Sequence, residues 1–188
     1  MNVVDEIKAG RKDLCGANLY DADLRRADLR GAILSDADLR KANLRGADLR
    51  RADLRSADLR RADFSCADLS YANLYKTDLC GAILCNTDLY GADLCGAILC
   101  NADLRGAKLY NTGLLSADLR RANLRVFQTN LWTAYIQKDT ITIGCQKHSI
   151  RQWKEFTDEE ISKMYSNALT YWKKYKDVIF SIHATLEN

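Results

Sequence analysis

Leucine recurs at every fifth position over most of this chain, with polar residues at most of the positions between. The series runs from 14 to 124 without a gap, and the only substitute is Phe64. A small residue, in most units Ala, stands two positions before each Leu, and Asp or Asn usually separates the two, as in the stretch Ala22-Asp23-Leu24-Arg25-Arg26. Such an internal repeat decides the architecture before local propensities do.

A period of five fits neither an α-helix nor a straight strand. On a helix each successive Leu would turn by about 140°, and on a strand successive leucines would alternate between faces. A chain that bends once per unit instead gathers every Leu inside, with Ala beside it. The pattern therefore predicts an all-β solenoid of stacked coils. Its expected core includes Leu24, Leu44, Leu59, Phe64, Leu84, Leu104 and Leu119.

Aspartate precedes Leu in fourteen units, and this regularity favours a structural role. Asp and Asn side chains accept hydrogen bonds from nearby backbone N–H groups, so they suit the bend of each unit. Catalysis needs one perturbed group in a pocket, not a uniform lattice of solvated carboxylates. The chain also has no Pro, which agrees with a hydrogen-bonded ladder of coils.

Residues 13–125 resemble the pentapeptide-repeat family, whose consensus is A(D/N)LXX. The resemblance implies a right-handed quadrilateral β-helix with four units per coil and about six coils. The sequence itself establishes only the five-residue unit and not the number of units per coil. Some members of the family dimerise through a C-terminal helix and imitate DNA to protect or inhibit type II topoisomerases such as gyrase.

The two ends of the chain depart from the repeat. Residues 1–12 are expected to form an N-terminal cap and residues 13–143 the β-helix. The period slips after Leu124, and residues 126–143 are interpreted as a degenerate last coil that resumes at Thr129-Asn130-Leu131. Residues 144–188 are expected to form a C-terminal helical cap, because open coil ends need cover against aggregation.

The C-terminal segment carries helix signals. Thr157 followed by Glu160 predicts a capping box that opens a long amphipathic helix, and residues 149–156 are expected to form a shorter one. This region is expected to close the end of the solenoid, and the sequence leaves open whether the long helix also makes a contact between two copies of the chain. The apolar stripe expected on it includes Ile161, Tyr165, Trp172 and Ile179.

Charge narrows the range of partners. The 188 residues carry a formal net charge of +3, and residues 13–125 hold 14 Arg and 3 Lys against 16 Asp. Local Arg–Asp pairing is therefore expected, and nucleic acid is not an expected partner. DNA mimicry would need a denser negative surface. The acidic start without an apolar core, and the lack of a run of about 20 apolar residues, predict a cytoplasmic protein that does not enter a membrane.

The seven cysteines and two histidines offer little chemistry. An odd Cys count without a secretory signal favours free thiols, although on four units per coil Cys80 and Cys100 would be neighbours near enough for a disulfide. Cys145 and His148 alone are a weak candidate for a metal or nucleophile site, and a structural turn is favoured there. No cofactor, metal or catalytic residue is expected, so the chain is interpreted as a non-enzyme.

The outward side chains then become the main candidates for function. Arginines predicted to stack in columns and tyrosines in the later coils could present a surface to a macromolecule. We expect a non-enzymatic scaffold with a protein partner, and the alternative is a DNA-mimicking modulator of gyrase. The candidate surface residues are Arg40, Arg60, Tyr75, Tyr90 and Tyr110.

Overall fold

The computed structural model describes residues 3–129 and 132–186, which fall into two compact units. The N-terminal unit comprises residues 1–122, and the C-terminal unit comprises residues 123–188. Each unit has its own kind of secondary structure and its own core, so the two are described separately.

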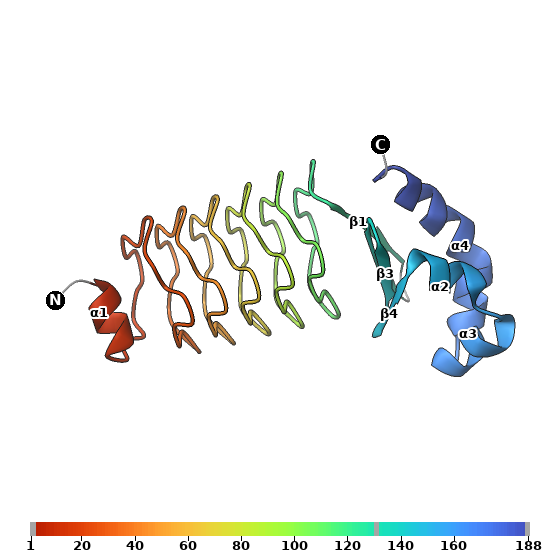
Figure 1. The fold of residues 1–188 in the computed structure, drawn as a ribbon, viewed down its shortest axis with the longest axis horizontal. Coiled ribbons are helices and arrows are strands. Elements are labelled where there is room, and N and C mark those ends of the chain that lie inside the picture. The colour runs from red at the N-terminus through yellow and green to blue at the C-terminus, as the bar shows by residue number, and fades with distance from the viewer. Residues whose placement is uncertain (1–2, 130–131, 187–188) are drawn as a thin grey trace. The chain divides into compact units, whose positions relative to one another are not determined.

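The N-terminal unit is a stack of coils preceded by helix α1, Val3–Lys8 (Figure 1). Parallel bridges join residues twenty positions apart, from Asp13 with Ile33 through Ile98 with Asp118. Each coil therefore contains four of the five-residue units, the number that the sequence alone left open. Ile7 on α1 is buried.

Backbone hydrogen bonds connect each coil to the next in both directions. The Leu14 N–H donates to the carbonyl of Ile33 at 2.8 Å, and the Asp38 N–H donates back to the carbonyl of Ala17 at 3.0 Å. The same pair of bonds recurs along the stack, and Pro at either donor position would remove one of them. The ladder, with inward Leu, makes the unit a β-solenoid.

The corners depend on a backbone conformation that L-residues rarely adopt. The Ala17 N–H donates to the carbonyl of Leu14 at 3.0 Å, which closes a β-turn, and the equivalent bond recurs at later corners. Every corner residue at position i+2 of these turns, from 16 to 121, has positive φ, as a type II turn requires. Fifteen of them are not Gly, including Arg26 and Tyr71, at a steric cost of about 1–2 kcal/mol for each residue. The ladder holds them in this conformation.

Most of the expected core lies inside the coils. Leu24, Leu44, Leu59, Phe64, Leu84 and Leu104 are at most 2% exposed. Leu119 is only half-buried, because the bridges of this unit end at Asp118 and no further coil of the unit stacks beyond it. At three units Thr replaces the inward Ala, and its buried hydroxyl donates to a carbonyl of the preceding coil, as Thr87 does to Phe64 at 2.8 Å.

The C-terminal unit begins with an antiparallel sheet in the order β1-β2-β3-β4. Its strands are β1 Leu124–Gln128, β2 Thr133–Gln137, β3 Thr140–Ile143 and β4 Gln146–Ser149. The prediction of a degenerate coil over 126–143 is therefore wrong, although Asn130 and Leu131 lie outside the described residues. The difference lies in the pairing: these strands pair antiparallel with their neighbours in the chain, whereas a coil pairs in parallel with residues twenty positions away.

Three helices follow the sheet. They are α2 Ile150–Glu155, α3 Asp158–Met164 and α4 Ala168–Ala184. The predicted short helix and the Thr157–Glu160 capping box are both present. The predicted single long helix is instead two helices, because the backbone is extended at Tyr165, where the side chain packs edge-on against Trp132 at 4.7 Å between ring centroids.

The apolar stripe of α3 and α4 is used inside the C-terminal unit. Ile161, Trp172 and Ile179 are buried in one cluster with Ile136 and Ile141 of the sheet, and Tyr165 packs against this cluster. His183 Nε2 lies 2.7 Å from the carbonyl of Lys138, which ties the end of α4 to the sheet connection. Residues 123–188 thus form an α+β unit with a core of its own.

Candidate functional site

The residue after each Leu points outward and stacks on its counterpart one coil away. In the column of residues 20, 40, 60, 80, 100 and 120, Arg40 donates from Nε and Nη2 to Asp38 at 2.8 and 2.6 Å. Its Nε also lies 3.6 Å from Asp58 of the next coil, and Arg60 repeats the arrangement with Asp58 and Asp78. The two predicted arginines therefore belong to a continuous Asp–Arg ladder.

The fork between Arg and the Asp two positions earlier is the common motif of this surface. The hydrogen bonds from Arg40 hold the pKa of Asp38 below its usual range, and Asp38 in turn raises the pKa of Arg40. Solvent-exposed pairs contribute little to stability. Their main effect is to neutralise and orient the guanidinium groups. Such forks form at Arg25, Arg30, Arg40, Arg50, Arg55, Arg60, Arg105 and Arg120.

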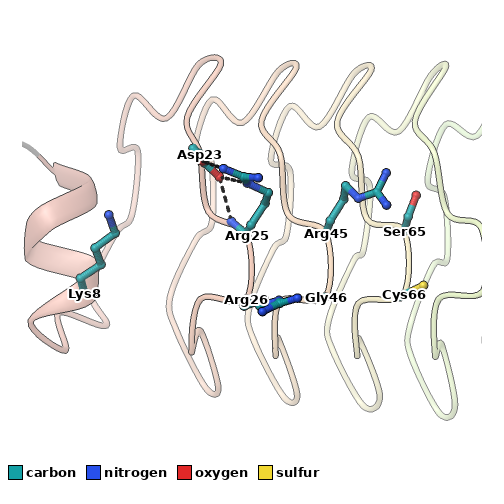
Figure 2. Close-up of a pocket in the computed structure, with 8 residues that line it drawn as sticks. All are labelled: Lys8, Asp23, Arg25, Arg26, Arg45, Gly46, Ser65 and Cys66. Carbon is teal, nitrogen blue, oxygen red and sulfur yellow. Dashed lines mark hydrogen bonds and ion pairs between the residues drawn. The ribbon is translucent and has the colours of Figure 1, made fainter.

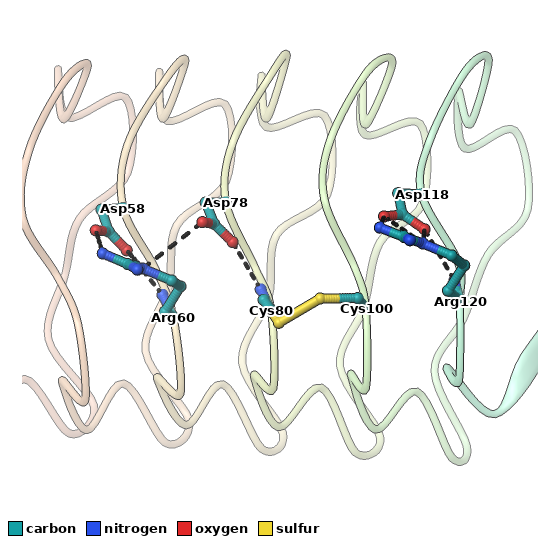
Figure 3. The surroundings of a disulfide bond; sticks show 7 residues. All are labelled: Asp58, Arg60, Asp78, Cys80, Cys100, Asp118 and Arg120. Carbon is teal, nitrogen blue, oxygen red and sulfur yellow. Dashed lines mark hydrogen bonds and ion pairs between the residues drawn. A yellow bond between two sulfur atoms is a disulfide. The ribbon is translucent and has the colours of Figure 1, made fainter.

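A disulfide between Cys80 and Cys100 continues the same column (Figure 3). Its Cα atoms are 4.7 Å apart, so stacked coils bring the two thiols within bonding range. The sequence left this pairing open. The other cysteines are free thiols, as the sequence favoured for the set as a whole; they are Cys15, Cys66, Cys85, Cys95 and Cys145.

Three tyrosines form a contact series that we call the tyrosine ladder: Tyr71, Tyr90 and Tyr110. Ring centroids are 5.1 Å apart between Tyr71 and Tyr90, and 5.5 Å apart between Tyr90 and Tyr110. Tyr71 is 53% exposed and Tyr110 is 38% exposed. Sequence reasoning missed Tyr71 because it lies at a corner; its signal is a separation of nineteen residues from Tyr90, close to one coil.

Tyr75 lies in a different column from the tyrosine ladder. It is 39% exposed, and the Lys76 ammonium group lies 5.1 Å from its ring centroid. Two coils further along the same column, Leu115 is 69% exposed. The five predicted surface residues thus occupy three faces of the coil, with Arg40 and Arg60 on one and Tyr90 and Tyr110 on another.

A cationic groove of about 680 Å³ opens near the N-terminal end of the stack (Figure 2). We call it the Arg26 groove. Sequence reasoning missed it, since the signal is a single exchange: Asn43 stands where most units have Asp, so Arg45 has no fork partner two positions earlier. The lining residues are Lys8, Asp23, Arg25, Arg26, Arg45, Gly46, Ser65 and Cys66.

Cys145 and His148, the weak candidates for a metal or nucleophile site, pack against side chains of the C-terminal unit. Cys145 Sγ contacts the Tyr165 hydroxyl, while His148 packs edge-on against Trp153 and Phe156, and burial lowers its pKa. Within residues 3–129 and 132–186, no three His, Cys, Asp or Glu side chains are grouped to hold a metal ion. Across the same ranges, none of the helices has the length and apolar character needed to cross a bilayer.

The repeat matches a known protein family and resembles solved structures of that family. The family model for pentapeptide repeats matches eight copies within residues 11–125, and no curated protein matches. Among solved structures, HetL, a pentapeptide repeat protein involved in heterocyst differentiation regulation from the cyanobacterium Nostoc sp. strain PCC 7120, is 34% identical over 59% of each chain, with a TM-score of 0.44. The chain therefore covers about three fifths of HetL.

Two further structures are similar at lower TM-scores. A pentapeptide repeat protein from the Arabidopsis thaliana thylakoid lumen is 30% identical, with a TM-score of 0.36 over 57% of this chain and 68% of that one. A trypsin-treated form of QnrB1, a plasmid-mediated fluoroquinolone resistance protein, is 25% identical, with a TM-score of 0.28 over 56% of this chain and 66% of that one.

Proposed function

We propose that this chain, which belongs to the pentapeptide-repeat family, is a non-enzymatic scaffold that binds a protein partner through the tyrosine ladder. The carrying observation is that Tyr90 contacts both Tyr71 and Tyr110, and that these two outer rings are exposed whereas Tyr90 is partly buried. Exposed aromatic residues are enriched at protein–protein interfaces, where they supply apolar area together with a polar hydroxyl. Pentapeptide-repeat proteins fold as right-handed quadrilateral β-helices, and we propose that this chain has about six coils.

The backbone beneath the tyrosine ladder supports this proposal. The Tyr71 N–H donates to the carbonyl of Tyr90 at 2.8 Å, and the Gly91 N–H donates to the carbonyl of Tyr110 at 3.1 Å. The three rings are therefore carried on coils that are bonded to one another. A partner would order few additional groups on binding, and low ordering cost favours affinity. The filled interior of the coils also favours binding over catalysis.

Quantitative affinity capture tests the tyrosine ladder. The immobilised full chain is exposed to native lysate and compared with the double variant Tyr71→Ser/Tyr110→Ser. The matched control is Tyr20→Ser, which removes a tyrosine that is 45% exposed and lies outside the ladder. We expect the double variant to lose a partner that the control retains. Equal capture by all three proteins would remove the tyrosine ladder as the binding surface.

The predictions for the chain ends become proposals here. We propose that α1 covers the first coil and that the C-terminal segment is a cap, with the alternative that it also joins two copies of the chain. Val178 on α4 is 44% exposed, so it is available for a contact between copies. Size-exclusion chromatography with light scattering distinguishes the two: a wild-type dimer that becomes a monomer on Val178→Lys supports dimerisation, and a wild-type monomer rejects it.

The alternative function is that of a DNA-mimicking modulator of gyrase. The resemblance of the repeat to the pentapeptide-repeat family supports this alternative. The charge pattern weighs against it, because the carboxylates of the outward columns are largely paired with Arg. A gyrase supercoiling assay tests this alternative directly. Inhibition or protection by micromolar protein would favour it over the scaffold proposal, and no effect would reject it.

A further inference from the structure

The Arg26 groove holds more positive charge than its own residues neutralise. Its described lining has four cationic side chains and a single carboxylate. That carboxylate, Asp23, already accepts hydrogen bonds from Arg25 Nε at 2.8 Å and Nη2 at 2.6 Å (Figure 2). None of the three other cations donates a hydrogen bond to this carboxylate, although the positive charge of Lys8 contributes to lowering the pKa of Asp23.

The surroundings of these three cations differ from those of the forked arginines. Arg45 Nη1 lies 3.7 Å from Asp63 of the next coil, outside hydrogen-bond range. The side chains of Lys8 and Arg26 make no hydrogen bond or ion pair within the described part of the chain. The groove thus combines one long ion pair, between Arg45 and Asp63, with two cations that form no hydrogen bond or close ion pair in the described part of the chain.

The sequence explains how this excess arises without disturbing the fold. Asn43 Oδ1 still accepts the Arg45 N–H at 3.3 Å, so the turn keeps its local bond. An amide, however, cannot neutralise the Arg45 guanidinium as Asp38 does for Arg40. A single Asp-to-Asn exchange in the repeat therefore leaves the coil intact and removes one negative charge from the groove wall.

The three cations come from different elements and line one opening. Arg45 follows Arg25 in a column, and Lys8 extends from α1. Arg26 occupies a corner, where its Cγ lies 3.7 Å from the place that a Cβ on Gly46 would take, so its stem lies across the following coil. Guanidinium groups match the oxygens of phosphate in fork geometry, and an ammonium group adds a mobile point charge.

We propose that the Arg26 groove binds a small polyphosphorylated anion through Lys8, Arg26 and Arg45. A ligand with three or more negative charges complements the three cations, and phosphate oxygens accept several hydrogen bonds at once. This site is on a different surface from the tyrosine ladder and does not depend on the proposed protein partner.

Isothermal titration calorimetry of the full chain with tripolyphosphate tests the site at low ionic strength. We expect one-to-one binding that weakens as salt is added. Arg26→Ala should weaken binding by about tenfold, because it removes a charge-assisted contact. The matched control is Arg61→Ala: both arginines are exposed corner residues with positive φ, and each lies across a Gly of the next coil.

A second pair of variants tests the origin of the excess charge. Asn43→Asp restores the consensus residue and should give Arg45 a fork partner, so it should weaken tripolyphosphate binding while preserving the far-ultraviolet circular dichroism spectrum. Asn73→Asp makes the same charge change on another face and should leave binding unaltered. Equal weakening by the two Asn variants, or by Arg26→Ala and Arg61→Ala, would overturn the proposal, as would the absence of binding.

Two comparison ligands identify the chemistry. Adenosine triphosphate should bind about as tightly as tripolyphosphate if the phosphate chain is what the groove recognises. Sulfate that binds equally well at matched ionic strength would show a non-selective anion patch and overturn the assignment. A short DNA duplex whose tighter binding is lost in Arg26→Ala would also overturn it, in favour of a nucleic-acid partner.

Discussion

Replacing Leu59 by Ala should destabilise the N-terminal unit more than any surface substitution of the same kind. Leu59 is fully buried, and its stacked neighbours Leu39 and Leu79 are fully buried too, so the shortened side chain leaves a cavity between them. Buried Leu-to-Ala substitutions cost about 2–5 kcal/mol, depending on how far the surroundings relax. A central value of about 3 kcal/mol would lower the Tm by about 6–12 °C for a chain of this size.

Leu115→Ala supplies the control, because it removes the same atoms from a side chain that is 69% exposed. Surface substitutions of this kind stay within about 0.5 kcal/mol. Thermal unfolding followed by far-ultraviolet circular dichroism measures the loss of the coils. The three tryptophans all lie in the C-terminal unit, so their fluorescence follows that unit separately. If both variants lowered the circular-dichroism transition equally, the inward placement of the repeated Leu would be wrong.

Gly91→Ala should lower the free energy of unfolding, measured in urea, by about 1–3 kcal/mol more than Gly16→Ala does. Both glycines have positive φ, but of the two only Gly91 has an aromatic ring, that of Tyr71, 2.8 Å from the position of an added Cβ. Equal effects of the two substitutions would contradict this reasoning. Arg25 lowers the pKa of Asp23 from 3.8 to about 2, so the ionised Asp23 carboxylate stabilises the fold at pH values above its unfolded pKa. The urea midpoint should therefore fall as the pH drops from about 4 to 2. A rise of the midpoint over this range would refute the reasoning. Reduction of the Cys80–Cys100 disulfide should lower stability by about 2–4 kcal/mol, measured as urea midpoints with and without reductant; unchanged midpoints would exclude a stabilising role.

The sequence predicted the inward side of the coil well, because burial of each Leu is decided within its own five residues. It could not predict how many units close one coil, since that depends on backbone pairing between distant residues. The near-duplicate stretches beginning at Gly81 and Gly96 are fifteen residues apart and do not match the twenty-residue coil. The local pattern predicts the five-residue unit, whereas the stacking of the coils is visible only in the backbone hydrogen bonds between them.

The corners and the C-terminal unit show why other features escaped prediction. Propensity disfavours positive φ at Arg26, yet the bonds between coils impose it. The helix break at Tyr165 depends on its contact with Trp132, thirty-three residues earlier. In the candidate sites, the positions of Tyr90 and Tyr110 could be predicted by assuming that residues twenty positions apart stack. Tyr71 and the Arg26 groove could be recognised only once the length of the coil was known from the structure.

The twenty-residue coil makes the surface sensitive to the phase of any insertion or deletion. Loss of one whole coil would leave every later side chain on its original face, whereas loss of a single unit would rotate all later positions by a quarter turn. After such a loss between Tyr90 and Tyr110, the buried leucines would still point inward, but the two rings would no longer share a face. The buried core therefore tolerates changes in chain length that would alter which side chains share a face on the surface.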